Sequence, residues 1–136
     1  MTPEQIDLIK KSFDTMWSVN GDIAELCYSR FFELVPHVRD LFPSDMEMQR
    51  VKLMDMLAAL VGSLDQRELF QSLVANSGRH HARFGVQPPH YAALGEALMW
   101  SLERKLGVAF TPQLRESWSA LYASVQAEML RAAAQA

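Results

Sequence analysis

The sequence predicts an all-α fold with about six longer helices and one short helix. Apolar residues recur at three- and four-residue spacing in almost every segment of the chain. Proline, glycine, and Asn or Asp residues separate these segments at short intervals, and no segment shows the strict alternation of a β-strand. The chain has 136 residues, without an internal repeat or a linker-like stretch. We therefore expect one domain that spans residues 1–136.

The N-terminal half predicts three helices and one short helical piece. Pro3 suits a helix start, and the Asn-Gly-Asp sequence at 20–22 breaks that first helix. Pro36 marks a tight junction before a short helix over 37–42. Ser44 and its neighbours offer a capped start for the next helix. The wide apolar face of that helix consists of Leu53, Met56, Leu57, Leu60, Val61 and Leu64.

The C-terminal half predicts three further helices. The first spans 66 to about 83 and ends before Gly85. A long helix over 90–106 follows two prolines and ends at Gly107, and the last helix begins at Thr111 with Pro112. The expected inner residues of the first of these helices are Leu69, Phe70, Leu73 and Val74.

Composition excludes several classes of partner. The net charge is −3 and no basic tract is present, so the sequence offers no electrostatic footprint for nucleic acid. The single cysteine, Cys27, lies in an apolar run and is expected to be a small core residue. The N-terminus shows no secretory signal, and no charge-free run is long enough to span a membrane. We expect a cytoplasmic protein.

The histidines are the main candidates for chemistry. The sequence contains no zinc-binding His-Glu-x-x-His pattern, phosphate loop, dinucleotide fingerprint or nucleophile elbow. An iron site with one histidine ligand stands out by elimination. His80 and His81 fall on opposite shoulders of the apolar stripe of their helix, so periodicity does not choose between them. The alternative is that both are helix-end residues that interact with the helix dipole.

The stretch Gly78-Arg79-His80-His81-Ala82-Arg83-Phe84-Gly85-Val86 resembles the proximal segment of single-domain bacterial globins, flavohaemoglobins and neuroglobin-like globins. The following residues 87–95 resemble the His-Tyr-x-x-x-Gly helix start of that family. Gly107, Trp118 and Tyr122 match later landmarks. The resemblance implies a globin fold, with haem b as the cofactor and His81 as the iron ligand.

The resemblance also implies a distal side of the haem. Tyr28 stands where bacterial globins carry a hydrogen-bond donor, and Gln49 takes the ligand-facing position at the start of the distal helix. These two side chains would donate hydrogen bonds to O₂ at the iron. No histidine occupies this distal position, and His37 is not assigned to it. We therefore do not expect bis-histidine ligation.

Other positions complete the expected haem pocket. The backbone carbonyl of Ser77, one turn before His81, is expected to accept the imidazole N–H. Ala133 stands where flavohaemoglobins carry a glutamate that strengthens the proximal histidine, and Glu128 is about five residues too early for that place. Lys52 or Arg79 is expected to pair with a haem propionate. The remaining expected lining residues are Phe42, Leu53, Leu57, Leu73, Val86, Tyr91, Leu94 and Tyr122.

Three functions fit these residues. The first is reversible binding of O₂, and of CO and NO, by a monomer or weak homodimer. The second is NO dioxygenation, which would require a separate reductase because no flavin or nicotinamide domain is recognisable in the sequence. The third is a haemless interaction module with the same fold. A fold alone does not choose among them, so the function has to be argued from the site.

Overall fold

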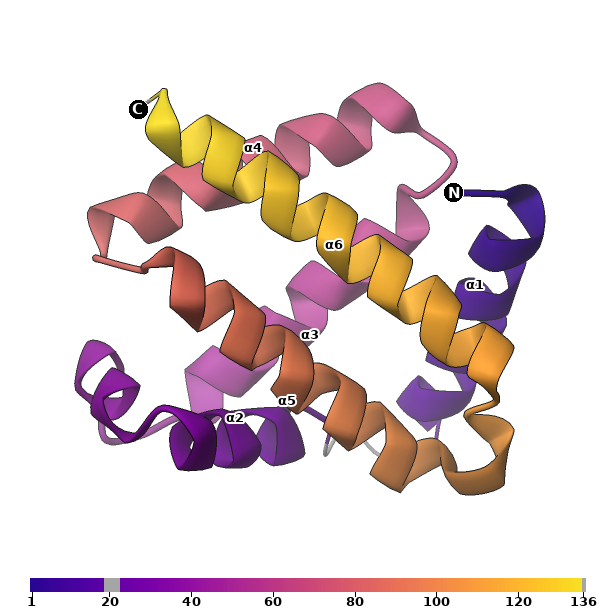
Figure 1. Cartoon of the computed structure of the whole chain (residues 1–136), viewed down its shortest axis with the longest axis horizontal. Coiled ribbons are helices and arrows are strands. Elements are labelled where there is room, and N and C mark those ends of the chain that lie inside the picture. The colour runs from indigo at the N-terminus through magenta and orange to yellow at the C-terminus, as the bar shows by residue number, and fades with distance from the viewer. Residues whose placement is uncertain (19–22, 136) are drawn as a thin grey trace.

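The computed structural model describes residues 1–18 and 23–135. These residues form six α-helices and two short 3-10 helices, without a β-strand among them (Figure 1). The all-α prediction is confirmed, and the expected break at 20–22 lies outside the described residues. In chain order the elements are α1 (Pro3–Ser18), α2 (Ile23–Leu34), η1 (Pro36–Leu41), α3 (Glu47–Gly62), α4 (Arg67–Arg83), α5 (Pro88–Leu106), η2 (Gly107–Ala109) and α6 (Pro112–Ala134).

The helix ends follow the residues that the sequence singles out. Proline opens α1, α5 and α6, where its missing N–H would have no intrahelical partner. Thr111 caps α6, because its hydroxyl oxygen accepts the backbone N–H of Leu114 at 3.2 Å. Gly85, just past α4, has a φ of 79°, and Gly107, at the end of α5, has a φ of 55°. Residues with a side chain rarely adopt these φ values, so glycine suits both positions.

The start of α3 is capped from within the expected stretch 44–47. The backbone N–H of Glu47 donates to the carboxylate of Asp45 at 3.0 Å, and Met46 occupies the position directly before the helix. The side chain that satisfies the first turn therefore belongs to Asp45 and not to Ser44. An Asp-based turn of this kind serves the same purpose as a serine cap.

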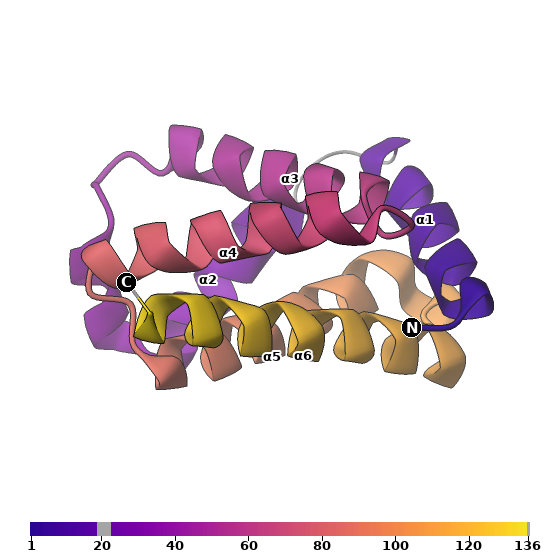
Figure 2. The same ribbon diagram turned by 90° about the horizontal axis from the view of Figure 1, so that it is seen from above.

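The helices form two layers. Figure 2 shows α3 and α4 on one side of the molecule and α5 and α6 on the other. Between the layers α4 packs along α6. The helix α2 packs along α5, and α1 closes one end by contacts with α3 and α6. None of the helices in the described part of the chain is long and apolar enough to cross a membrane.

Two close contacts fix α6 against its neighbours α4 and α1. A Cβ atom at Gly78 would lie 2.5 Å from the carbonyl oxygen of Met129, so glycine is what lets α4 approach the backbone of α6. The indole N–H of Trp118 donates to the hydroxyl of Ser12 at 2.9 Å, and this buried bond joins α6 to α1. Cys27 is fully buried in the core, as expected, and burial raises the pKa of its thiol to about 12.

The inward face of α4 is not centred where the sequence suggested. Val74 and Gly78 are the buried residues of this helix, whereas Leu69 is 47% exposed. At about 100° per residue, Leu69 lies roughly 140° around the helix from Val74. The expectation that Leu69 faces inward is wrong, because contact with α6 and not local apolarity sets the buried face.

Candidate functional site

The structure separates the two adjacent histidines of α4. His81 lies about 20° around the helix from Val74 and is half-buried, whereas His80 lies about 120° away and is exposed. Burial, with a smaller effect from His80, lowers the pKa of His81. A neutral imidazole keeps a nitrogen lone pair, which is what a metal ion requires of a histidine ligand. The geometry therefore singles out His81 from the ambiguous pair.

A tyrosine of α5 lies against the His81 ring. The hydroxyl of Tyr91 is 3.5 Å from Nδ1 of His81, and the two rings meet edge-on with centroids 6.1 Å apart. Tyr91 is buried, and burial raises its pKa. The hydroxyl is thus a second neighbour for the imidazole, in addition to the expected Ser77 carbonyl. Sequence reasoning placed Tyr91 in the pocket lining and missed its contact with the histidine.

Tyr122 of α6 holds the backbone beneath Tyr91. Its hydroxyl donates to the carbonyl oxygen of Tyr91 at 2.5 Å. A Cβ atom at Gly95 would lie 2.6 Å from the Tyr122 ring, so the glycine makes room for this side chain against α5. Burial raises the pKa of Tyr122, which keeps the hydroxyl protonated as a donor. Tyr122 therefore links α6 to the residue that touches His81.

Tyr28 of α2 and Gln49 of α3 form a second group. The side-chain amide nitrogen of Gln49 donates to the hydroxyl oxygen of Tyr28 at 3.2 Å. Tyr28 is buried, and burial raises its pKa to about 12 although the bond from Gln49 acts in the opposite direction. In the described part of the chain no protein group accepts the Tyr28 proton. A buried phenol with an unused O–H suits recognition of an acceptor ligand.

Phe42 completes this second group. Its ring meets Tyr28 edge-on, with centroids 5.5 Å apart, and lies at the same distance from Phe32. Arg39 fixes the turn that carries Phe42 by donating to the carbonyls of Pro43 at 2.7 Å and Ser44 at 2.9 Å. Its guanidinium also lies 5.1 Å from the Phe32 ring centroid. Sequence reasoning missed Phe32 and Arg39, although Phe32 follows Tyr28 at helical spacing.

The other expected pocket residues differ in exposure. Leu57 and Tyr91 are buried, and those half-buried are Phe42, Leu53, Leu73, Ser77, Val86, Leu94 and Tyr122. Lys52 is exposed and forms no ion pair with a described residue. In the described part of the chain, no hydrogen bond or ring contact joins His81 and Tyr91 to the second group, which consists of Tyr28, Gln49 and Phe42. The two sets of residues are therefore not bonded to each other.

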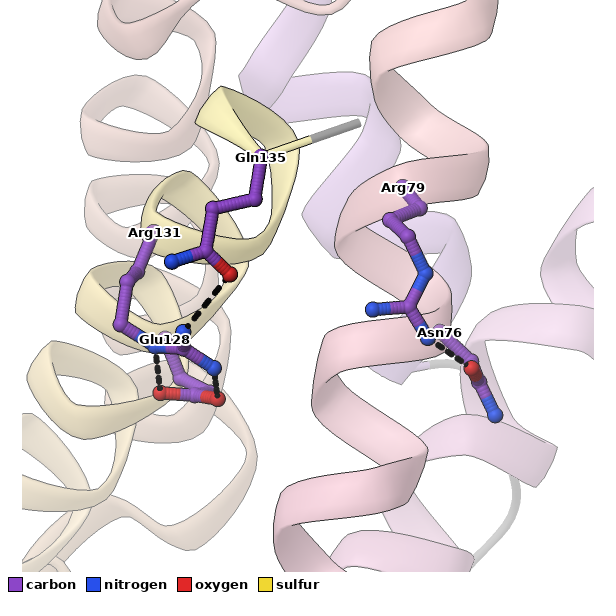
Figure 3. Close-up of polar contacts among 5 residues, drawn as sticks. All are labelled: Asn76, Arg79, Glu128, Arg131 and Gln135. Carbon is purple, nitrogen blue, oxygen red and sulfur yellow. Dashed lines mark hydrogen bonds and ion pairs between the residues drawn. The ribbon is translucent and has the colours of Figure 1, made fainter.

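No glutamate is available at the position where flavohaemoglobins carry one near the proximal histidine. Ala133 is half-buried near the end of α6 and has no polar side-chain atom. The Glu128 carboxylate is bound by Arg131 through two hydrogen bonds of 2.9 and 2.5 Å (Figure 3). Arg131 also lowers the pKa of this carboxyl. Glu128 therefore serves an ion pair, in agreement with its unsuitable sequence position.

The donor set suits a metal that arrives within a prosthetic group. Among the described residues no cluster of three or more His, Cys, Asp or Glu side chains is placed to hold a metal ion. One imidazole is a poor site for a bare ion, but it suffices for iron whose other ligands come from a porphyrin. A neutral imidazole, apolar lining residues and a buried phenol with its amide donor match that requirement.

Comparisons with known proteins agree with this interpretation. The sequence profile of the Globin family matches residues 25–129. The chain is similar to neuroglobin of Tetraodon nigroviridis, with 31% identity over 92% of this chain and 87% of that protein. It is 29% identical to neuroglobin of Danio rerio, over 91% of this chain and 87% of that protein. A flavohemoprotein of Vibrio cholerae is 28% identical over 90% of this chain but only 32% of its own length.

Proposed function

Because the chain belongs to the globin family, whose helices pack around a haem pocket, we propose that it binds haem b through His81 and reversibly binds O₂, CO and NO. The observation that carries this proposal is the hydrogen bond of 3.2 Å from half-buried Gln49 to buried Tyr28, which leaves the phenol proton unused by the described protein groups. A haem bound at His81 would supply an iron with an open coordination position for a diatomic gas.

His81 would hold the iron through Nε2. This assignment leaves Nδ1 with the proton, which then needs an acceptor to fix the ring orientation. The Tyr91 hydroxyl, 3.5 Å away, and the Ser77 carbonyl one turn back are the two acceptors we propose. Both are uncharged. Their pull on the proton is weaker than that of a carboxylate, so the electron donation by His81 stays moderate.

Tyr28 would act on the gas ligand. O₂ develops partial negative charge on its outer atom when it binds ferrous iron, and a phenol O–H is a good donor to that atom. Gln49 donates to the Tyr28 oxygen, which orients the phenol and makes its proton a stronger donor. CO develops less charge on its outer atom, so we expect the pair to favour O₂ over CO. Phe42 packs on the Tyr28 ring and limits its movement.

The absorption spectrum of the purified protein tests the proposal. The protein is measured as isolated, after reduction with dithionite, and after addition of O₂ or CO. We expect a strong Soret band, an unliganded ferrous form and a stable complex with each gas. A missing Soret band after addition of haemin would contradict the proposal and favour the haemless interaction module.

NO dioxygenation is the second candidate. The similarity to a flavohemoprotein favours it, and the Tyr28–Gln49 pair suits it equally well. The reaction joins one NO, one O₂ and one electron into one nitrate, so a separate reductase must deliver the electron. Measuring NO consumption and nitrate in the presence of O₂ and a reductant distinguishes this activity from simple gas binding. Sustained turnover would establish the dioxygenase.

Domain extent, cellular location, oligomeric state and partners complete the proposed function. We propose that residues 1–136 fold as one domain and act in the cytoplasm as a monomer or weak homodimer. The proposed partners are the three gases, with a reductase for the enzymatic alternative. Sedimentation analysis of the haem-loaded protein over a range of concentrations tests the oligomeric state.

A further inference from the structure

The C-terminal part of α4 carries positive charge in an acidic protein. The sequence contains 16 Asp and Glu residues and has a net charge of −3. Between Glu68 and Glu96, however, there is neither an Asp nor a Glu. This interval contains Arg79, His80, Arg83 and Phe84, which we call the α4 basic surface. Its positive charge is opposite in sign to the net charge of the chain and therefore creates a local positive field.

The two arginines of this surface are not neutralised. Figure 3 shows the contrast with Arg131, whose guanidinium is held by the Glu128 carboxylate and by Gln135. Arg79, the alternative to Lys52 as a propionate partner, lies about 160° around α4 from His81 and donates instead to the neutral side-chain amide of Asn76. Glu128 lines the same groove as Arg79, but Arg131 already occupies its carboxylate.

Arg83 is exposed and forms no ion pair or hydrogen bond through its side chain with a described residue. Since neither Arg79 nor Arg83 has a carboxylate partner within the described chain, both charges remain available to another molecule. A paired surface arginine such as Arg131 would first have to lose its own partner. The α4 basic surface is therefore prepared for an anionic partner.

An exposed aromatic ring lies within this surface. Phe84, directly after α4, is 62% exposed, and its ring centroid lies 4.8 Å from that of His80. Aromatic and arginine residues are the types that dominate protein–protein binding energy, whereas an isolated phenylalanine gains nothing from exposure to water. One exposed ring among cations suits a compact protein surface better than a lipid bilayer, which favours several inserted apolar residues.

The α4 basic surface is also next to His81, the proposed iron-binding residue. The backbone N–H of Phe84 donates to the carbonyl oxygen of His81 at 3.1 Å, so one hydrogen bond joins the exposed residue to the iron-binding residue. A protein bound here would approach the haem from its proximal side and leave the Tyr28 side open to gas. This location suits a partner that exchanges electrons with the iron.

We propose that the α4 basic surface docks the acidic face of a one-electron donor protein that keeps the iron ferrous. The inference rests on the proposed haem-binding function. One electron leaves the reduced cofactor of the partner and converts Fe(III) to Fe(II). No atom or proton is transferred in this step. Arg79 and Arg83 supply the attraction, and Phe84 supplies the apolar contact.

Binding measurements test the docking surface without relying on turnover. The haem-loaded, CO-bound protein is labelled with ¹⁵N and titrated with an oxidised flavodoxin, a small acidic electron-transfer protein that serves as the probe. We expect the amide signals of residues 79–85 to shift and the binding to weaken with added salt. Shifts confined to other helices, or binding that salt does not weaken, would overturn the proposal.

Matched variants locate the charges that matter. The double variant R79Q/R83Q is expected to bind the flavodoxin about three- to tenfold more weakly, as two exposed ion pairs allow. R67Q is the control, because Arg67 is an exposed arginine at the other end of α4. It should bind as the unmodified protein does. Equal weakening by R67Q would show that only net charge matters and would overturn the docking site.

Three further outcomes are distinguishable. A missing Soret band refutes the proposed function before any titration, whereas a normal Soret band without flavodoxin binding refutes only the docking surface. Sedimentation with phosphatidylserine-containing vesicles tests the lipid alternative. Vesicle binding that depends on Arg79 and Arg83, without flavodoxin binding, would assign the surface to membranes instead.

Discussion

Gln49 of α3 donates its side-chain N–H to the hydroxyl oxygen of Tyr28 on α2 at 3.2 Å. The direction of this bond matters, because it consumes an acceptor site on the phenol and leaves the phenol proton for a ligand. Tyr28 is buried and its pKa is raised to about 12, so the proton stays in place at neutral pH. The pair is therefore arranged as a donor to a bound gas.

Removal of the Tyr28 hydroxyl tests this arrangement. In Tyr28→Phe we expect O₂ to dissociate about 2- to 10-fold faster, because one hydrogen bond of about 0.5–1.5 kcal/mol is lost. CO dissociation should change far less, since CO is a poorer acceptor. Flash photolysis and stopped-flow mixing give both rates. Equal changes for O₂ and CO would indicate a steric effect and contradict the donor role.

The assignment of the iron ligand is tested by the two neighbouring histidines. We expect His81→Gly to lose most of its Soret absorbance or to bind haem weakly, and added imidazole to restore the ligated spectrum. His80→Gly is the matched control, because it makes the same helix substitution at an exposed position. It should retain the spectrum of the unmodified protein. Loss of haem in the His80 variant alone would reverse the assignment.

The crossing of α4 and α6 predicts a sharp stability effect. Gly78→Ala places a Cβ atom 2.5 Å from the backbone carbonyl oxygen of Met129, so one helix must shift. We expect a loss of about 1–3 kcal/mol in the free energy of unfolding. Urea denaturation followed by circular dichroism measures it.

Gly62→Ala is the control for this substitution. Gly62 ends α3, and a Cβ there would meet nothing within 4 Å. Alanine at this position should leave the stability unchanged or raise it by a few tenths of a kcal/mol, because alanine has the higher helix propensity. Similar losses in both variants would show that the close crossing is not the cause.

The titration of His90 is expected to make the free energy of unfolding depend on pH. Its Nδ1 accepts the backbone N–H of Gln87 at 2.9 Å, and burial, together with His37, lowers its pKa below 6.5. The unfolded chain therefore takes up the proton more readily than the folded chain. The free energy of unfolding should be highest above pH 6.5 and should fall as the pH decreases toward the lowered pKa.

Urea titrations of the CO-bound protein at pH 7.5 and pH 5.5 measure this contribution. His90→Asn keeps a side-chain acceptor near the Gln87 N–H but does not titrate in this range. We expect a smaller loss of stability in the variant between the two pH values. An unchanged pH dependence would assign the effect to other groups.

The sequence predicts much of this fold because helix ends are local features. Pro3, Gly107 and Pro112 act through their own backbone geometry, and their helices begin or end where expected. Asp45, within the stretch 44–47 that the sequence marks as a capped start, accepts the backbone N–H of Glu47. Which face of a helix is buried depends on its neighbours. Leu69 was misplaced for that reason, because α6 lies over Val74 and Gly78.

The site was only partly accessible from the sequence. Periodicity left His80 and His81 equivalent, and the choice required the resemblance or the position of α6. The approach of Gln49 to Tyr28 joins residues 21 positions apart, and no local rule predicts such a contact. The same holds for the approach of Tyr91 to His81, 10 positions apart on a different helix. Arg39 was missed because its partners are backbone carbonyls, which leave no pattern of side chains.

The hydrogen bond between Trp118 and Ser12 bears on where this domain begins. The family profile starts at residue 25, after α1. Ser12 lies in α1, and its hydroxyl receives the indole N–H of a tryptophan that is 1% exposed. A chain shortened to the profile boundary would leave that N–H without its partner and uncover the apolar surface beneath α1. The region that the family profile matches is thus smaller than the set of helices that pack together, because α1 packs against α3 and α6.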